Sequence, residues 1–340
     1  MPTPSANPAD LLAAFDRASR VLLTTHVRPD GDALGSVAAL AIALRAKGKV
    51  ADILLLSKLP SKYRFVLEEP GLGHTDLAVG PAPDFASYDT LVVADTGTFS
   101  QLPGLEKVIP EFERRGGRGG AVLVVDHHRT QEGWGRVRVV DTAAASATEL
   151  IGRLLKLWNV PLTAELAEVL YVGIVSDTGW FAFSNTTSTT LRLTADLMDA
   201  GANPDRLYQR LFQSEREPRL RLQSRAQSSL QLLAGGRLAV ITVRAADFTE
   251  TGAAVPDTEN LINFPLQLAA VEMSLLVTET PPPDNATIKV SCRSKGKVDV
   301  ARFAEQFGGG GHARASGLKL PAPLEVATAT LIAAAIAALG

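Results

Sequence analysis

The sequence contains very little cysteine: Cys292 is the only one among 340 residues. A single cysteine excludes a disulfide framework and a zinc site built from a cysteine cluster, and it fits a reducing compartment. The N-terminus lacks a basic segment followed by an apolar core, so we predict no signal peptide. The apolar run at residues 327–339 is too short to cross a bilayer and has the pattern of a packed helix. We therefore predict a cytoplasmic protein with no membrane contact.

A strong charge of either sign is missing as well. The chain carries 34 basic and 36 acidic residues, so its overall charge gives no sign of a nucleic-acid-binding protein. Hydrophobic residues make up 46% of the chain, enough for a large core, and 340 residues are more than one domain usually needs. The composition changes at an arginine-rich stretch around Pro218. We predict one domain at residues 1–213 and another at 226–340, joined by a linker at 214–225.

Three apolar runs of the first domain each lead into polar residues. The runs begin at Val21, Thr90 and Ala121, and near-continuous apolar runs are typical of parallel strands covered on both faces. Parallel strands present their carboxyl ends at one edge of a sheet, where ligands bind. A further aspartate follows a helical pattern at residues 163–175. In chain order, the polar residues that we expect at one site are His26, Asp30, Asp32, Asp95, Asp126, His127, His128 and Asp177.

These residue types together point to metal ions. Carboxylates oppose each other's ionisation when they share a site, and cations relieve that repulsion. Carboxylate with imidazole suits Mn²⁺ or Mg²⁺, with zinc or iron as further options, and this many ligands suffices for two ions. Two ions ~3.5–4 Å apart can activate water and stabilise both oxygens of a phosphoryl displacement. Taken singly, Asp95 also fits a helix cap, Asp177 a turn, and His127-His128 a structural pair.

The spacing of these residues resembles a known superfamily. His26-x3-Asp30-x-Asp32, Asp95, Asp126-His127-His128 and Asp177 resemble the four motifs of the DHH phosphoesterases. The run Gly309-Gly310-Gly311-His312 resembles that of the DHHA1 domain. The resemblance spans nearly the whole chain and implies an α/β fold, with an N-terminal parallel-sheet DHH domain and a smaller α/β DHHA1 domain. Within the superfamily, the sequence is most similar to the NrnA-like group of small bacterial oligoribonucleases.

The resemblance also implies a role for each matching position. One ion would be bound by His26, Asp30 and Asp95, and the other by Asp32, Asp95, His127 and Asp177. His128 would act on the scissile phosphate as a transition-state donor or general acid, and Asp126 would orient an imidazole. The expected cofactors are two divalent cations, Mn²⁺ first and Mg²⁺ as the alternative. Ala182 departs from the arginine that many relatives have there, which leaves one phosphate contact in doubt.

The second domain has a local excess of positive charge. Residues 286–320 contain seven basic and two acidic residues, which favours a phosphate-bearing partner. Consecutive glycines allow backbone N–H groups to approach phosphate oxygens closely. The predicted substrate-binding residues are Arg293, Gly309, Gly310, Gly311 and His312. The plainer alternative is a mobile glycine loop beside a solvated strand, with Lys295 and Lys297 serving only solubility.

The resemblance implies hydrolysis of short oligoribonucleotides to mononucleotides and removal of the 3′-phosphate of 3′-phosphoadenosine 5′-phosphate, by a hydroxide that bridges the two ions. The expected partners are therefore short single-stranded RNA or DNA oligonucleotides and 3′-phosphoadenosine 5′-phosphate. The alternatives are a phosphodiesterase for linear or cyclic dinucleotides, a family II pyrophosphatase, a long-strand exonuclease and a non-catalytic nucleotide sensor. The sequence leaves open the cleavage polarity, the physiological ion, the substrate preference and the oligomeric state, a homodimer included.

Overall fold

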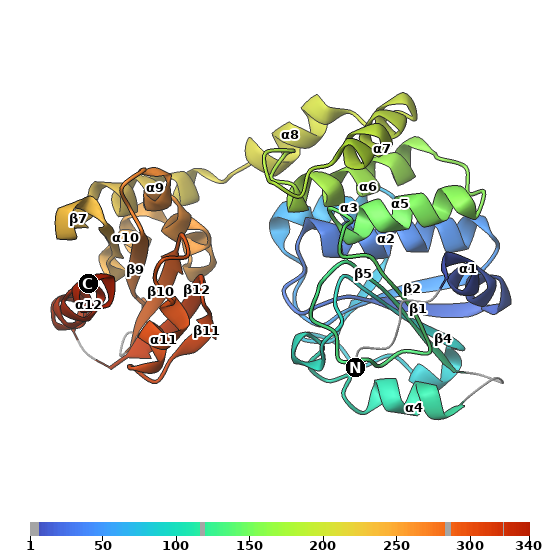
Figure 1. Ribbon diagram of the computed structural model, residues 1–340, viewed down its shortest axis with the longest axis horizontal. Coiled ribbons are helices and arrows are strands. Elements are labelled where there is room, and N and C mark those ends of the chain that lie inside the picture. Colours follow the sequence, from blue (N-terminus) through green and yellow to red (C-terminus); the bar gives the residue numbers. More distant parts are fainter. Residues whose placement is uncertain (1–6, 116–119, 283–286, 322) are drawn as a thin grey trace. The chain divides into compact units, whose positions relative to one another are not determined.

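The computed structural model describes residues 7–115, 120–282, 287–321 and 323–340, except for the side chain of His312 (Figure 1). The chain divides into two compact units, Met1–Ser214 and Glu215–Gly340. Residues 214–225, the expected linker, run into helix α9 (Glu217–Ser228), whose Leu222 and Ala226 are buried. Within the described residues, each unit is built around one six-stranded sheet.

The sheet of the first unit is parallel throughout, in the order β3-β2-β1-β4-β5-β6. This order is that of a doubly wound fold. The strand order reverses between β1 and β4, which is the topological switch point of the sheet. Ligands of such folds bind outside the carboxyl ends of the strands at that point. The strands are β1 (Arg20–Thr24), β2 (Val50–Leu55), β3 (His74–Asp76), β4 (Thr90–Ala94), β5 (Ala121–Asp126) and β6 (Val137–Val140).

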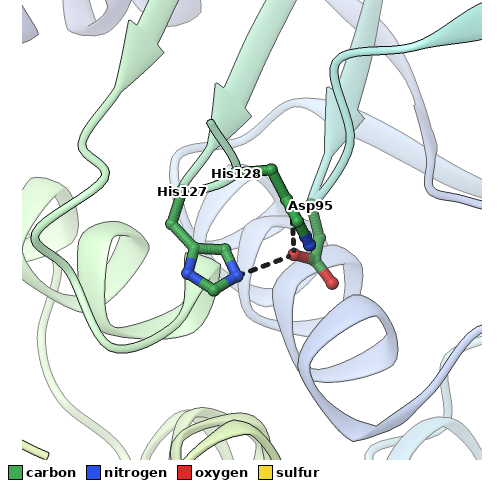
Figure 2. A group of neighbouring side chains, drawn as sticks. All are labelled: Asp95, His127 and His128. Carbon is green, nitrogen blue, oxygen red and sulfur yellow. Dashed lines mark ion pairs between the residues drawn. The ribbon is translucent and has the colours of Figure 1, made fainter. Parts of the chain in front are cut away.

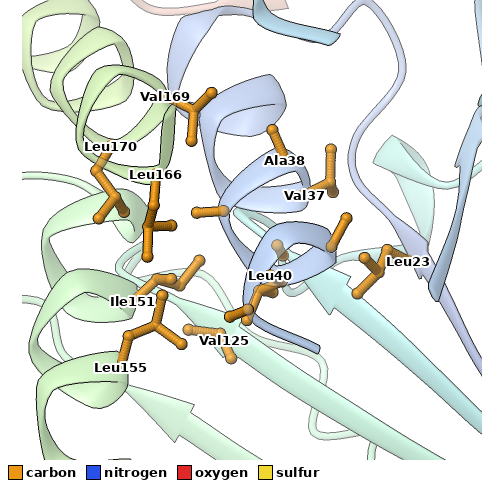
Figure 3. Close-up of a cluster of buried hydrophobic side chains, with 14 of the residues drawn as sticks. Leu23, Val37, Ala38, Leu40, Val125, Ile151, Leu155, Leu166, Val169 and Leu170 are labelled. Carbon is orange, nitrogen blue, oxygen red and sulfur yellow. The ribbon is translucent and has the colours of Figure 1, made fainter. Parts of the chain in front are cut away.

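Both faces of this sheet are covered by helices, as the apolar runs indicate. In β4, Val92 and Ala94 belong to one hydrophobic cluster, whereas the alternate residues Leu91 and Val93 belong to the cluster on the other face. Figure 3 shows part of the larger cluster, where helical side chains such as Leu40, Ile151 and Leu166 meet Leu23 and Val125 of the strands. The helices of this unit are α1 (Pro8–Arg17), α2 (Gly31–Ala46), α3 (Arg64–Glu68), α4 (Val108–Arg115), α5 (Ala147–Leu157), α6 (Ala164–Asp177), α7 (Ser188–Asp199) and α8 (Pro204–Phe212).

Helix α2 is the central helix of the first unit and packs against α5 and α6. Its N-terminus is capped by Asp30, whose side chain accepts hydrogen bonds from the N–H groups of Asp32 and Ala33. Gly35 lets α2 approach α6 closely, since a Cβ there would lie 2.6 Å from the carbonyl oxygen of Val169. The first turn of α2 is thereby held beside the sheet edge that carries the site.

The sheet of the second unit is mixed, in the order β11-β12-β10-β9-β8-β7. Strands β8 and β9 pair in parallel, and the other neighbours pair antiparallel. The strands are β7 (Gln231–Leu233), β8 (Leu238–Val243), β9 (Met273–Glu279), β10 (Ile288–Ser294), β11 (Gly310–His312) and β12 (Ala315–Leu320). The remaining helices are α10 (Ala245–Thr251), α11 (Val300–Glu305) and α12 (Leu324–Leu339).

Helix α12 packs on the core of the second unit through Leu324, Leu331 and Ala335, as its apolar pattern predicts. Among the described residues, we find no helix with both the length and the apolar character that a membrane span requires. The prediction of an α/β protein with a parallel N-terminal sheet and a second, C-terminal sheet is confirmed. The glycine run, expected as a loop, forms β11, the edge strand of the second sheet.

Candidate metal centre and catalytic site

Asp95 lies at the centre of the polar cluster of the first unit. It follows β4 directly, is only 2% exposed, and has a φ angle of +62°, a conformation that is strained for a residue other than glycine. One of its oxygens, Oδ2, lies 3.5 Å from Nε2 of His26. The other, Oδ1, lies 3.4 Å from Nε2 of His127 and 3.6 Å from Nδ1 of His128. Figure 2 shows the Asp95 carboxylate facing both rings.

The expected ligands come together in two groups, one of His26, Asp30 and Asp95 and the other of Asp32, His127 and Asp177. The two groups contact each other at Asp95 and His127. The ligand atoms within each group lie within 4.8 Å of one another. In the second group, Nε2 of His127 lies 3.1 Å from Asp177 Oδ2 and 3.8 Å from Asp32 Oδ2. Asp95 also lies within this distance of both consecutive histidines, His127 and His128, so a further set of three possible ligands overlaps both groups.

Unpartnered atoms at the centre of the cluster fit metal ions. Asp95 Oδ1 and His127 Nε2 are both buried, and although they lie 3.4 Å apart, neither makes a hydrogen bond of acceptable geometry. A buried polar atom without a partner costs about 1–3 kcal/mol, so native structures rarely keep one without a reason. A divalent cation would satisfy both atoms, and carboxylate with imidazole is the donor set that Mn²⁺ accepts readily. The residues present therefore fit a metal centre.

The electrostatics of the cluster favour protonated histidines. Burial alone would lower the pKa of His26 and His127, but Asp95 raises that of His26 to about 9. The carboxylates of Asp177 and Asp95, 3.1 and 3.4 Å from Nε2, raise the pKa of His127 to about 11. Burial opposes ionisation of Asp95, yet the two histidines lower its pKa to about 2. A cation must displace the histidine protons, so we expect metal affinity to increase with pH, which titration with Mn²⁺ at acidic and neutral pH would measure.

His128 differs from the other two histidines in exposure. Its side chain is 53% exposed, against 17% for His26 and 13% for His127. Its Nδ1 lies 2.8 Å from Oδ1 of Asp126, a bond that directs the opposite ring nitrogen away from that carboxylate. An exposed imidazole held from behind can contact a substrate, whereas one that used Nδ1 as a metal ligand would lose the Asp126 bond.

Asp126 is itself held by a hydrogen-bonded chain that the sequence did not indicate. Its Oδ1 accepts hydrogen bonds from the N–H groups of His127 and His128, and its Oδ2 accepts one from the side-chain amide of Gln131. The guanidinium of Arg138, only 5% exposed, donates to Gln131 Oε1 at 2.8 Å. These contacts hold both oxygens of Asp126, which is compatible with its predicted role of orienting an imidazole.

Residues 144–149, before and at the start of α5, were missed as a part of the site. The N–H groups of Ala147 and Thr148 donate to the Asp32 carboxylate at 2.6 and 2.9 Å, and the Thr148 hydroxyl donates at 2.6 Å. The Ala144 carbonyl lies 3.3 Å from His127 Nδ1. The side-chain amide of Asn185 donates to the backbone carbonyls of both Ala145 and Asp177. The segment therefore contacts Asp32 and His127 directly and is linked to Asp177 through Asn185. The helix cap Ser146, three residues before Glu149, was the available sequence signal.

The predicted substrate-binding residues lie in the second unit, on neighbouring strands. Arg293 on β10 pairs with Ala315 on β12, and Ala315 pairs with His312 on β11, so the three backbones share one row of the sheet. The side chain of His312 lies outside the described residues. Gly311 has a φ of +145°, and a Cβ there would lie 2.6 Å from the Ala315 carbonyl oxygen. Gly309 is similarly crowded, so the strand contact alone explains these two glycines.

Gly310 is different, since a Cβ there would meet nothing within 4 Å. Its backbone is exposed at the sheet edge and can be approached by a ligand. Of the nearby cations, Lys297 Nζ pairs with Glu272 at 2.6 Å, and Lys295 Nζ donates to the Leu268 carbonyl at 2.7 Å. These two lysines therefore have local structural partners, whereas Arg293 Nη1 donates to the carbonyl of its own neighbour, Cys292.

Comparison with known proteins supports the fold. A solved structure, that of an exopolyphosphatase-related protein from Bacteroides fragilis, superposes with a TM-score of 0.84. The superposition covers 96% of this chain and 94% of the other, at 24% sequence identity. At that identity the likeness speaks for the fold alone, and it extends over both units of the chain.

The sequence comparison defines the class and then the family. Residues 20–174 match the DHH family, N-terminal domain, and residues 239–339 match the DHHA1 domain. The bifunctional oligoribonuclease and PAP phosphatase NrnA of Thermus thermophilus is 31% identical over 312 residues, covering 92% of this chain and 87% of the relative. The Bacillus subtilis protein of the same name is 26% identical and covers 92% of each chain. The protein is thus an enzyme of the phosphoesterase class. The chain belongs to the DHH family, as the motifs predict.

Proposed function

We propose that the enzyme is a metal-dependent phosphodiesterase and phosphatase for small nucleotides. Its substrates would be short oligoribonucleotides, released as mononucleotides, and 3′-phosphoadenosine 5′-phosphate, which would lose its 3′-phosphate. The Thermus and Bacillus relatives, which are a bifunctional oligoribonuclease and PAP phosphatase by name, support this choice of substrates. Short single-stranded DNA would be a further substrate.

The single observation that carries the proposal is the pair of ligand groups around Asp95. A phosphoryl transfer needs positive charge at the phosphorus centre more than it needs covalent chemistry. Asp95 has one oxygen directed toward His26 and the other toward His127, so it can bridge two cations. We assign one cation to each ligand group and expect Mn²⁺, with Mg²⁺ as the alternative. His26, Asp30 and Asp95 would hold one ion, and Asp32, His127 and Asp177 would hold the other. Asp95 would contribute its second oxygen to that other ion, because this oxygen lies 3.4 Å from Nε2 of His127.

The residues of the chain would then have separate roles in hydrolysis and in substrate binding. Divalent cations bound there supply an activated water and neutralise the charge that builds up on the phosphate. His128, exposed and held by Asp126, would donate a hydrogen bond or a proton to the oxygen that leaves. In the second unit, Arg293 and the exposed backbone around Gly310 would bind a substrate phosphate. One arginine and one exposed stretch of backbone would contact few phosphates, which favours short substrates.

A side-by-side assay tests this function. The enzyme is given a ribodinucleotide, 3′-phosphoadenosine 5′-phosphate, pyrophosphate and a 24-residue RNA, and the release of mononucleotide and phosphate is measured in single-turnover experiments at fixed salt. We expect the first two to be hydrolysed fastest and kcat/KM to fall with RNA length, because added nucleotides would gain few contacts while losing conformational freedom. Preference for pyrophosphate, or equal kcat/KM at every length, would refute the proposal.

A further inference from the structure

An aromatic patch on the first unit serves no purpose in the metal centre described above. It consists of Trp180, Tyr208 and Phe212, with ring centroids 5.0 Å apart for Trp180–Tyr208, 5.6 Å for Trp180–Phe212 and 5.0 Å for Tyr208–Phe212. Tyr208 and Phe212, both on α8, are 41% and 48% exposed. Trp180 is half-buried and packs against the core, whereas the two rings beside it are exposed. Large aromatic side chains gain most when they are buried, so two adjoining exposed rings mark a surface that binds something.

The turn that presents Trp180 is strained. Gly179, Trp180 and Phe181 all have positive φ angles, of 54°, 56° and 66°, and two of the three carry bulky side chains. The turn is held by hydrogen bonds from the Trp180 N–H to the Val175 carbonyl and from the Phe181 N–H to the Thr178 hydroxyl. Backbone strain that the surroundings maintain is concentrated at functional sites. The strain here places the indole at the start of the aromatic patch.

Two connections tie the patch to the metal centre. Trp180 follows the predicted ligand Asp177 by three residues. Tyr63 lies beside the liganding loop, since its Cε1 would be 3.1 Å from a Cβ on Gly31, the residue between Asp30 and Asp32. The residue before Tyr63 is Lys62, whose ammonium lies 4.9 Å from the ring centroid of Phe212. An aromatic surface, a cation and the proposed phosphate-hydrolysing centre are therefore adjacent parts of one unit. Within this surface the Tyr208 and Phe212 rings are tilted by 37° to each other, and the Trp180 ring stands edge-on to both.

We propose that the aromatic patch stacks a nucleobase of the substrate while Lys62 contacts a neighbouring phosphate. Every base has a π-face, so stacking would favour nucleotides over phosphoesters without a base, whatever the base is. The positive charge of Lys62 complements the phosphate that each nucleotide carries. The inference rests on the proposed function and deepens it, because it makes the base a specificity determinant of the same site.

The test compares Phe212→Leu with Phe212→Trp. Leucine keeps the apolar bulk and loses the π-face, whereas tryptophan keeps both. Single-turnover kcat/KM is measured for a ribodinucleotide and for the same dinucleotide without bases. We expect Phe212→Leu to reduce the ratio of the two values about 5- to 150-fold, the range for loss of one base–aromatic stack, and Phe212→Trp to preserve it. Phe264→Leu, at a phenylalanine of the second unit that is 37% exposed, is the matched control and leaves the ratio unchanged.

A binding readout separates this inference from the proposed function. With Trp134 and Trp158 replaced by Phe, a dinucleotide with a methylene in place of the bridging oxygen should quench the fluorescence of Trp180. Quenching supports the patch as a base site even if the natural dinucleotide is not hydrolysed, an outcome that would refute only the proposed function. An unchanged kcat/KM ratio in Phe212→Leu overturns the inference. So does a lower mass of Phe212→Leu in light scattering, because the patch would then be a contact between copies of the chain.

Discussion

The two units carry their predicted functional residues in opposite ways. The first unit gathers charged side chains from four separated segments at the carboxyl edge of its parallel sheet. The second unit presents an edge strand, β11, in which two of the three residues are glycine. Side chains that bind metals must be oriented by their neighbours, so their support is extensive and specific. A phosphate can instead be bound by backbone N–H groups, and there the absence of side chains is what matters. Mutations should therefore act differently at the two edges.

The largest effect in the first unit is expected from replacing Asp95. Replacing it with Ala removes a ligand from both predicted ions and leaves His26 and His127 without their shared partner. We expect kcat to fall ~10³-fold or more, since removal of a single stabilising group of an oxyanion already costs ~10²–10³-fold. Turnover of the ribodinucleotide measures the loss, and chelation of wild-type protein followed by Mn²⁺ should reproduce and then reverse it. An active Asp95→Ala protein would contradict the two-ion assignment.

A smaller effect is expected at His128, which is predicted to act on the substrate without binding a metal. His128→Ala should lower kcat by ~10²–10³-fold with little change in KM, because a transition-state donor contributes little to ground-state binding. Metal content, measured by elemental analysis after gel filtration, should remain as in the wild type. Loss of bound metal in this variant would make His128 a ligand, as its grouping with Asp95 and His127 also allows.

The residues named in these predictions could be predicted from the sequence because the ends of buried strands can be recognised there. Apolar runs that stop at a polar residue locate the edge of a parallel sheet, and His26, Asp95 and Asp126 each stand at or just beyond such an end. The supporting residues were not visible. Thr148 contacts Asp32 over a separation of 116 residues, and Gln131 and Arg138 contact Asp126 through a chain of hydrogen bonds. Such contacts arise from tertiary packing and leave no local periodicity.

Short edge elements were missed for a related reason. Strand β11 consists of two glycines and a histidine, which have low strand propensity, so sequence patterns favoured a loop. The pairing with β12 overrides that preference, because it is set by the partner strand.

Helix α9 was not predicted, because Pro218 suggests a linker. In the structure this proline occupies the first turn of the helix, where proline is well tolerated.

Thr148 allows the support of one metal site to be weakened alone. Thr148→Val keeps the shape of the side chain and the backbone N–H bond to Asp32 but removes the hydroxyl bond of 2.6 Å to Asp32. It also removes the hydroxyl contact of 2.8 Å to Ser146, so Ser146→Ala serves as the control for that second contact. We expect the affinity for one of two Mn²⁺ ions to fall ~10- to 100-fold, as mutation of groups that orient metal ligands usually does. Isothermal titration gives both affinities separately. Equal weakening of both ions would mean that Thr148 supports the fold more generally than the Asp32 group.

In the second unit, Arg293 and Lys297 form a matched pair of cations. Lys297 already pairs with Glu272, so its removal should change KM less than about twofold, as for exposed ion pairs. Arg293→Ala should raise KM for 3′-phosphoadenosine 5′-phosphate ~10- to 150-fold, the worth of a charged hydrogen bond, with kcat little changed. The partition between KM and kcat is read from steady-state kinetics. Equal effects of the two variants would show that the local positive field, and no specific contact, binds the phosphate.

The smallest effect, and the sharpest test of the glycine edge, is expected at Gly310. A methyl group there meets nothing within 4 Å, so Gly310→Ala should leave the free energy of unfolding within about 0.5 kcal/mol of wild type. Gly311→Ala is the contrasting variant: its φ of +145° and a backbone contact at 2.6 Å should destabilise the second unit by ~1–3 kcal/mol. If the backbone at Gly310 binds phosphate, its alanine variant should raise KM several-fold at unchanged stability, because the methyl group keeps the ligand away from the N–H groups. Urea unfolding and steady-state kinetics of both variants separate the two effects. An unchanged KM in a stable Gly310→Ala protein would mean that the glycines serve strand pairing alone.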